Sequence, residues 1–215
     1  MTVVRAGLDR AAVASAALDL LDEVGLDGLS VRRLAEVLGV RSPALYWHFR
    51  DKAELLDLMA REILRPDVHT PVRSGEDWRE WVADGARRRR RALLSRRDGA
   101  RLVVGTRPGF EIAARTESDL GVLCDAGFGA VGGFRLLVAV GHYVTGFVIE
   151  EQGAARRHAA LTGPVPDVAE IEAMTPLLVG ALVDGGPPES DEAFEHGLAA
   201  LIAGSDPTTA GGVRG

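Results

Sequence analysis

The sequence contains almost no cysteine and no long apolar segment. Its only cysteine, Cys124, excludes an intramolecular disulfide and suits the reducing cytoplasm. This residue lies in an apolar-periodic stretch, which predicts a buried thiol. No run of about 18 uninterrupted apolar residues is present, so we expect no membrane span. The first residues also lack the apolar stretch and cleavage site of a secretion signal. These absences favour a cytoplasmic protein.

Motifs typical of enzymes are also missing. The sequence has no glycine-rich phosphate loop and no HExxH, GxSxG or CxxC motif. Its histidines are dispersed without the spacing of metal ligands: His48, His69, His142, His158 and His196. We therefore expect no catalytic residues, no cofactor and no metal site. An enzyme whose residues meet only in the fold is the alternative.

The residues that are present indicate a globular helical protein. The chain has 215 residues, of which 47% are hydrophobic and 26% charged, enough for a small module and a larger domain. We predict an all-α fold with helices over residues 9–24, 30–38, 42–49, 51–65, 78–94, 98–105, 111–126, 131–152, 168–182 and 190–203. The predicted divisions are a three-helix module with a helix-turn-helix (1–66), a larger helical ligand-binding and dimerisation domain (67–204) and a disordered tail (205–215).

Residues 29–52, LSVRRLAEVLGVRSPALYWHFRDK, predict two short helices joined by a tight turn. Ser30 is a candidate N-cap of the first helix, and Gly39 ends it because glycine tolerates the positive φ required there. Ser42 is a candidate N-cap of the second. Pro43 then occupies its first helical position, where the missing N–H costs no hydrogen bond.

The second of these helices presents an unusual surface. If Leu45 and Phe49 face inward, the residues left to solvent are Ala44, Tyr46, Trp47 and His48. Residues 28–52 hold five basic and two acidic side chains, whereas the whole chain carries a net charge of −6. A basic, aromatic surface on an acidic protein favours a helix that enters the major groove of DNA. From spacing alone, an ordinary helical hairpin with an aromatic rim is the alternative.

The stretch from Ala11 to Leu64 resembles the DNA-binding domain of TetR-type transcriptional regulators, through the pattern LGV-x-x-x-x-LYWHF-x-x-K. Two later stretches, SRRDGARLVVGTRP (95–108) and AVGHYVTGFVIEEQ (139–152), resemble the tetracycline-repressor branch. The resemblance implies a homodimeric repressor that releases a palindromic double-stranded operator when a small-molecule effector binds its C-terminal domain. A transcriptional activator, or a small-molecule binding protein or enzyme with a vestigial DNA module, is the alternative.

The resemblance assigns the DNA contacts to the helix pair. Bases or backbone would be approached by Ser42, Pro43, Ala44, Tyr46, Trp47 and His48. Pro43 and Ala44 offer only apolar contact, suited to a thymine methyl group. We also expect Trp47 to pack partly against the module while its indole N–H contacts phosphate. The phosphate-binding set would be Ser30, Arg32, Arg41 and Lys52.

The effector site departs from the tetracycline repressor. In the resembled proteins a Thr-Arg-Pro turn, here residues 106–108, lines the pocket and shifts when ligand binds. A histidine just before that turn is a metal ligand there, but the aligned residue here is Val103, which cannot coordinate a hard cation. An expected glutamine is replaced by Asp119, and the drug-gripping positions of the long helix fall near Gly85 and Arg89. Glu150 does match a carboxylate that serves the metal's water shell.

We therefore expect a mostly apolar effector, such as an antibiotic-like natural product, that needs no metal. The predicted lining is Val103, Thr106, Arg107, Pro108, Asp119, His142 and Glu150, with Leu177 or Leu178 from the partner subunit. The five consecutive arginines, 87–91, are interpreted as a solvated face.

The predicted dimer contact is a four-helix bundle formed by residues 131–152 and 190–203 of both copies. In this bundle Gly132, Phe134, Leu137, Val138 and Gly141 would face Leu198, Leu201 and Ile202. Residues 156–167 are interpreted as a mobile loop.

Overall fold

The computed structural model describes residues 8–65, 77–107, 109–160, 172–205 and 207, and within these ranges every regular element is a helix. The predicted all-α fold is confirmed. Pro108, most of the predicted tail and the predicted boundary at residues 66–67 lie outside the described residues.

The N-terminal module consists of α1 (Arg10–Gly28), α2 (Val31–Val37), α3 (Ser42–Leu45) and α4 (Lys52–Ile63). Side-chain caps begin three of them: Asp9 accepts from the amide of Ala12, Ser30 from Arg33 and Asp51 from Glu54. Leu34, Leu45 and Leu55 are fully buried in a core that joins all four helices. The prediction that the first helix stops at Gly25 holds locally, since φ there is +71° and a further turn follows.

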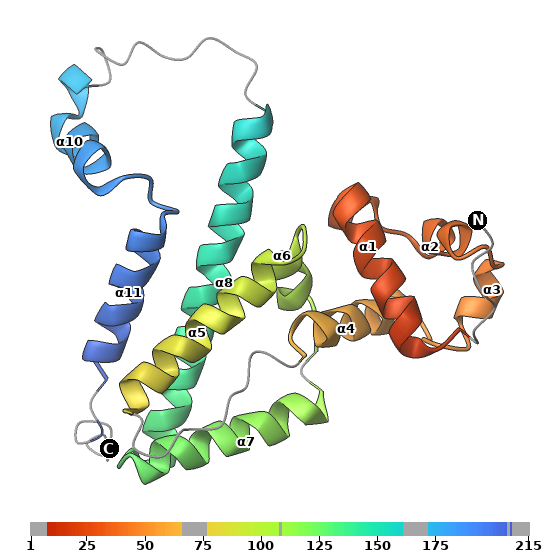
Figure 1. Cartoon of the computed structure of the whole chain (residues 1–215), viewed down its shortest axis with the longest axis horizontal. Helices are drawn as coiled ribbons and strands as arrows, with labels where there is room; N and C mark the ends of the chain where they lie inside the picture. Colours follow the sequence, from red (N-terminus) through yellow and green to blue (C-terminus); the bar gives the residue numbers. More distant parts are fainter. Residues whose placement is uncertain (1–7, 66–76, 108, 161–171, 206, 208–215) are drawn as a thin grey trace.

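The larger part of the chain consists of α5 (Trp78–Leu94), α6 (Gly99–Val104), α7 (Phe110–Asp125), α8 (Ala130–Ala160), α10 (Pro176–Gly185) and α11 (Asp191–Ala203). The long helix α8 is central, with α5, α6, α7 and α11 packed against it (Figure 1). By length and composition α8 could also cross a membrane, but Val144 and Val148 are fully buried within the bundle.

Two of the predicted elements differ in extent. Helix α8 continues through Arg156 and Arg157 to Ala160, so the predicted mobile loop is wrong at its start; residues 161–171 lie outside the described part. Of the predicted helix 168–182, residues 168–171 lie outside the described part, residues 172–174 are helical, and after a break at Thr175 helix α10 begins at Pro176, since proline fits the first turn of a helix.

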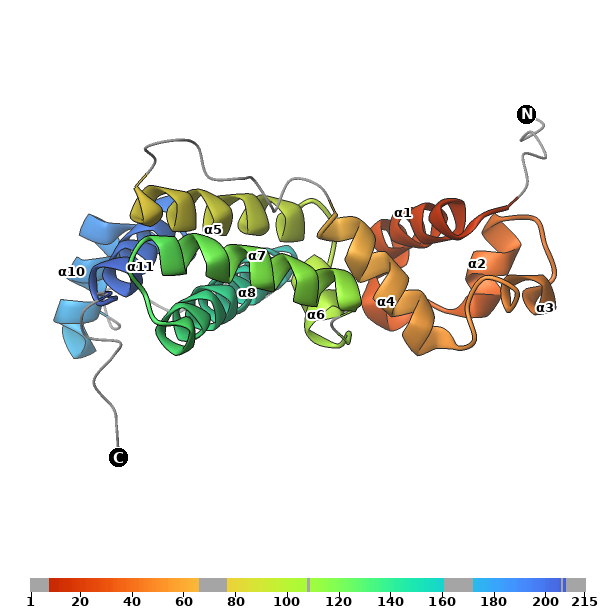
Figure 2. The ribbon, with the colours of Figure 1, turned by 90° about the horizontal axis from the view of Figure 1, so that it is seen from below.

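The two parts lie end to end in an elongated molecule (Figures 1 and 2). Helix α4 crosses between them: it packs against α1 at the outer end and against α6 at the inner end. Any shift of α4 therefore acts on both parts.

Candidate functional sites

The helix pair α2–α3 presents the aromatic surface that the sequence predicts. Leu45 and Phe49 are buried and hold the segment against the module. Ala44, Tyr46 and Trp47 are exposed, and His48 is half-buried. Trp47 is 89% exposed, so the expectation that it packs partly against the module is wrong. Exposed aromatic side chains of this kind are frequent at binding surfaces.

The predicted second helix is too long, and its predicted cap is wrong. Helix α3 begins at Ser42, so Arg41 occupies the N-cap position, without a side-chain cap bond. The helix ends at Leu45, and residues 46–48 form a turn in which the amide of His48 donates to the carbonyl of Leu45 at 2.9 Å. The tighter turn allows the side chains of both Leu45 and Phe49 to be buried against the module.

Glu54 stabilises the turn that contains Tyr46 and Trp47. Its carboxylate accepts from the backbone amide of Arg50 at 2.8 Å and from the Arg50 Nε at 2.9 Å. It also pairs with Arg10, whose Nε donates to the His48 carbonyl at 2.7 Å. The amide and side chain of Arg50 lower the pKa of Glu54 from 4.5 to about 2. Three chain segments thus meet at one carboxylate.

The predicted phosphate-binding residues surround this surface. Arg32 and Arg41 are exposed, and Arg32 pairs with Glu36 at 3.1 Å. The Ser30 hydroxyl serves as the cap of α2. Lys52 donates to the carbonyl of Leu29 at 2.8 Å and so joins α4 to the start of α2; its ammonium has further protons to offer.

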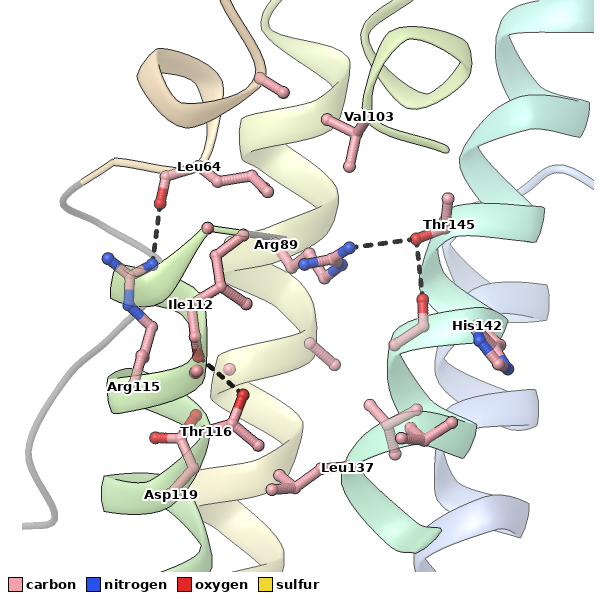
Figure 3. Close-up of a pocket in the computed structure, with 18 of the residues that line it drawn as sticks. Leu64, Arg89, Val103, Ile112, Arg115, Thr116, Asp119, Leu137, His142 and Thr145 are labelled. Atoms are coloured by element: carbon pink, nitrogen blue, oxygen red, sulfur yellow. Dashed lines mark hydrogen bonds between the residues drawn. The ribbon is translucent and has the colours of Figure 1, made fainter. Parts of the chain in front are cut away.

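A cavity of about 930 Å³ lies between α4, α5, α6, α7 and α8 (Figure 3). Of the predicted effector residues, it is lined by Val103, Thr106, Arg107, Asp119 and His142. The cavity excludes two others. Glu150 is exposed and lies 3.8 Å from Arg157, and Leu177 is 89% exposed on α10. Neither lines this chain's own cavity, so their role as effector residues stays a prediction, and Leu177 is open to contact from another chain.

Most of the cavity wall is apolar, and part of it is formed by residues that the sequence assigned to the dimer contact. These residues are Phe134, Leu137, Val138 and Gly141. Leu198 and Ile202 are buried within their own chain. The prediction that Leu198 and Ile202 face a partner subunit is therefore wrong, whereas the pairing stays a prediction for the other residues, of which Phe134 is 49% exposed.

The run of five arginines is not a simple solvated face. Arg87 pairs with Glu195 at 2.7 Å, and Arg90 pairs with Glu151 at 2.9 Å and Asp191 at 2.6 Å. The side chain of Arg90 is only 13% exposed. The prediction holds for Arg91, which is exposed.

The two arginines between them, Arg88 and Arg89, line the cavity. Arg89 donates from Nη2 to the Thr145 hydroxyl at 3.4 Å, across from α5 to α8 (Figure 3). The Nε atoms of both arginines are buried without a hydrogen-bond partner. Burial lowers the pKa of Arg89 because it disfavours the charged guanidinium. The sequence did carry a signal for this residue, since Arg89 falls near a drug-gripping position of the resembled repressors.

Helix α4 contributes directly to the cavity and to the turn beside it. Asp57 and Leu64 of α4 are lining residues. The carboxylate of Asp57 accepts from the backbone amide of Arg107 at 3.0 Å, in the predicted Thr-Arg-Pro turn. From α7, Arg115 donates to the carbonyl of Leu64 at 3.0 Å, at the C-terminal end of α4.

A buried carboxylate forms a second link between the two parts of the chain. Asp98, 4% exposed, accepts from the amide of Leu26 at 3.0 Å and from Arg101 at 3.2 Å, and it also pairs with Arg156. Burial alone would raise the pKa of Asp98, but these donors outweigh burial and lower it. Helices α1, α6 and α8 therefore share this one side chain.

Cys124 is exposed, so the prediction of a buried thiol is wrong. The adjacent Leu123 is fully buried. Neighbouring helical positions lie about 100° apart, which turns Cys124 outward.

Comparison with known proteins identifies the family. The profile of the tetR family of bacterial regulatory proteins matches residues 13–59, and that of the tetracyclin repressor-like C-terminal domain matches residues 70–207. The tetracycline repressor protein class A from transposon 1721 of Escherichia coli is 43% identical over 193 residues, 89% of this chain and 88% of that protein. The chain belongs to the TetR family of bacterial transcriptional regulators, and it is similar to the tetracycline repressors over most of its length. The resemblance seen in the sequence is confirmed.

Solved structures agree with this assignment. TetR (class A) in complex with 5a,6-anhydrotetracycline and magnesium has a TM-score of 0.69 and 39% identity, covering 89% of this chain and 94% of that chain. BioQ with its double-stranded DNA operator has a TM-score of 0.66 and 30% identity, covering 92% of this chain and 98% of that chain.

The residues of this cavity do not fit a magnesium ion. Mg²⁺ requires oxygen ligands in near-octahedral geometry, and Val103 offers no donor atom. The matched carboxylate, Glu150, points to solvent beside Arg157. Within the described ranges no group of three or more His, Cys, Asp or Glu residues is placed to hold a metal ion. The two guanidinium groups of Arg88 and Arg89 would also repel a divalent cation.

Proposed function

We propose that this protein is a ligand-responsive transcriptional repressor. Two copies bind a palindromic operator through α2 and α3 and release it when a small, largely apolar effector enters the cavity. The observation that carries the proposal is the bond from the amide of Arg107 to Asp57, at 3.0 Å. It connects the turn beside the cavity to α4, the helix that also supports the DNA-binding module.

The DNA half of the proposal is supported by the exposed surface of α3 and the turn after it. Tyr46 and Trp47 project from a buried anchor, and Arg32 and Arg41 lie exposed nearby. In a dimer, two such surfaces would reach successive major grooves, with the basic residues fixing the register and the residues of α3 reading bases.

The effector half is supported by the size and lining of the cavity. A volume of about 930 Å³ is within the range of small-molecule sites and accommodates a polycyclic molecule. A relative binds anhydrotetracycline with magnesium, but the residues here favour a ligand that brings no metal.

The dimer half is supported by exposed faces of three helices. Helix α8 leaves Ala139 and Gly146 exposed, and α11 leaves Ala199 and Ala203 exposed, so that two copies could approach closely. Helix α10 has no buried residue. In a dimer with shared pockets, the exposed Leu177 would contact the partner subunit.

The proposal describes a cytoplasmic regulator without catalytic activity. The matched relatives are transcriptional regulators. The DNA-binding module would extend from residue 1 to about residue 66, and the effector and dimerisation domain from there to residue 204.

The first test is binding of the intact protein to the DNA upstream of its own gene, across a series of salt concentrations. We expect specific binding whose log K falls steeply with log salt, since basic residues neutralise phosphates. Trp47→Ala should weaken operator binding at least about tenfold. Phe110→Ala is the matched control, because Phe110 is also 89% exposed but lies outside the module.

Equal effects of the two substitutions would show that the assigned surface does not read DNA. Binding no tighter than to unrelated DNA would overturn the repressor proposal for this upstream region. Challenge of the complex with tetracycline, with and without magnesium, then tests the effector half: release that requires magnesium would contradict a metal-free site.

A further inference from the structure

We propose that the effector of this cavity is an organic anion: a flat, largely apolar molecule whose acidic group binds Arg89 and Arg88. This inference rests on the proposed effector role of the cavity and specifies the chemistry of its ligand. It follows from the two cationic side chains that the apolar wall encloses.

Arg89 is placed to bind an anion rather than to stabilise the fold. Its guanidinium extends from α5 into the cavity toward Thr145 (Figure 3). The 3.4 Å hydrogen bond to the Thr145 hydroxyl is long and involves one of five N–H donors. The Thr145 hydroxyl in turn donates to the carbonyl of Gly141 at 2.8 Å, so it carries no charge that could balance the arginine.

Arg88 adds a second cation on the same wall. Its Nη2 is 3.8 Å from the position that a Cβ of Gly85 would occupy, so the guanidinium lies along the open face of that glycine. The buried Nε of Arg88, like that of Arg89, has no partner. Each of these fork-shaped guanidinium groups can hold a carboxylate or sulfonate in a bidentate manner.

The other arginines of the same helix show the alternative arrangement. Arg87 and Arg90 are each bound by carboxylates at 2.6 to 2.9 Å. Burial is the single cause of the pKa shift of Arg89, with no contribution from a described carboxylate. A buried cation without a counter-charge is costly, and a ligand that supplies the counter-charge would relieve that cost.

The acidic residues of the lining do not neutralise the positive charge of Arg88 and Arg89. The acidic residues are Asp57, Glu117 and Asp119, against the five arginines Arg61, Arg88, Arg89, Arg107 and Arg115. Asp57 already accepts from the amide of Arg107, Glu117 is exposed, and Asp119 is engaged in an interaction of its own. Around this site the surface is apolar, with Ile112, Leu137 and Val140 among the lining residues, which suits a ring system attached to the anion.

The test compares two probes of the same shape and different charge, anthracene-2-carboxylate and anthracene-2-carboxamide. Their affinities for the intact protein are measured by fluorescence and calorimetry at pH 7.5. We expect the carboxylate to bind at least about tenfold more tightly, as for a hydrogen-bonded charge pair. Arg89→Gln should reduce this preference to less than about threefold, and Arg89→Lys should restore part of it.

Arg91→Gln is the matched control, since Arg91 lies on the same helix but is exposed and outside the cavity lining. It removes the same charge and should leave the preference unchanged. Arg88→Gln provides a second variant, so the test does not depend on the folding of one protein, and circular dichroism verifies each fold.

Several results would overturn the proposal: no binding of either probe, equal affinities, or a preference that survives in both Arg89→Gln and Arg88→Gln. Its failure is distinguishable from failure of the repressor proposal. Operator binding by the same proteins is measured separately. A wild-type protein that binds its operator but does not prefer the carboxylate probe would refute only the proposed ligand chemistry.

Discussion

At the scale of single residues, the start of α6 depends on a glycine at a position where any Cβ atom would be crowded. A Cβ on Gly99 would lie 2.3 Å from the carbonyl oxygen of Leu93, which is backbone and cannot move aside. The preceding Asp98 has a positive φ of 56°, a strained conformation for a residue with a side chain. The turn therefore has a backbone conformation of higher energy, and this conformation places the Asp98 side chain against α1.

We predict that Gly99→Ala lowers the free energy of unfolding by about 1–3 kcal/mol, because the added methyl group forces the backbone apart. Gly121→Ala is the control: Gly121 is helical, exposed and open within 4 Å, so alanine there should stabilise the protein by up to about 1 kcal/mol. Chemical denaturation at pH 7 measures both changes. Equal effects would contradict the assigned crowding at Gly99.

Single residues also show where sequence reasoning reaches its limit. The inward direction of Leu45 and Phe49 was predictable because their spacing and apolarity leave one choice. The directions of Arg88 and Arg89 were not, since five consecutive arginines cover more than one turn and differ only in what packs opposite. Arg90 forms ion pairs with Glu151 of α8 and Asp191 of α11, and Arg87 forms one with Glu195 of α11. Of the remaining three, Arg91 is exposed to solvent and Arg88 and Arg89 line the cavity.

At the scale of elements, the connection from α3 to α4 depends on the charge of Glu54. Its pKa falls from 4.5 to about 2, chiefly through the amide and guanidinium of Arg50. A depressed pKa in the folded state means that the unfolded state binds a proton first as the pH falls. The stabilisation is therefore fully present above about pH 4.5 and is lost between there and about pH 2.

We predict that the stability difference between the wild type and Glu54→Gln is largest near pH 7 and disappears as the pH approaches 2. Glutamine cannot carry the charge, so the variant lacks this part of the pH dependence. Denaturant titrations of both proteins from pH 7 to pH 2 measure the difference, with Glu80→Gln on an exposed face of α5 as control. A difference that stays constant over this range would contradict the ionic role of Glu54.

Element boundaries were predictable where a local bond sets them. Ser30 caps the helix that the sequence assigned to it, the predicted helices 9–24 and 51–65 start at Asp9 and Asp51, which act as their caps, and Gly39 has the expected positive φ of 65°. The early end of α3 and the extension of α8 were not predictable in this way. The end of α3 follows from burial of two side chains against the module, and that of α8 from Arg156 reaching Asp98.

At the scale of the whole molecule, the acidic end of α1 meets an arginine-rich turn of the larger part. Asp22 of α1 binds Arg96 at 2.7 Å and accepts from the amide of Arg97 at 2.8 Å. Arg101 pairs with Asp27 at 3.1 Å. Most of these pairs are partly exposed and individually weak. Asp98 is the buried member, so it is the residue through which the two parts hold a fixed orientation.

We predict that Asp98→Asn loosens the contact between the two parts without unfolding either one. The amide keeps the shape and one acceptor for Leu26, but it removes the charge that Arg101 and Arg156 share, leaving both guanidinium groups without their buried partner. Hydrogen exchange should accelerate at the end of α1 and in α6. Operator affinity should fall, because two DNA-binding modules in a dimer must keep a set spacing to reach both half-sites.

Asp125→Asn is the control for this last prediction, since Asp125 is an exposed carboxylate at the end of α7. It should alter neither hydrogen exchange in α1 nor operator binding. If Asp98→Asn weakened operator binding while exchange in α1 and α6 stayed unchanged, the buried carboxylate would act on DNA affinity by another route. If neither quantity changed, the orientation of the module would be set by α4 alone, through Asp57 at the turn and Leu64 against Arg115.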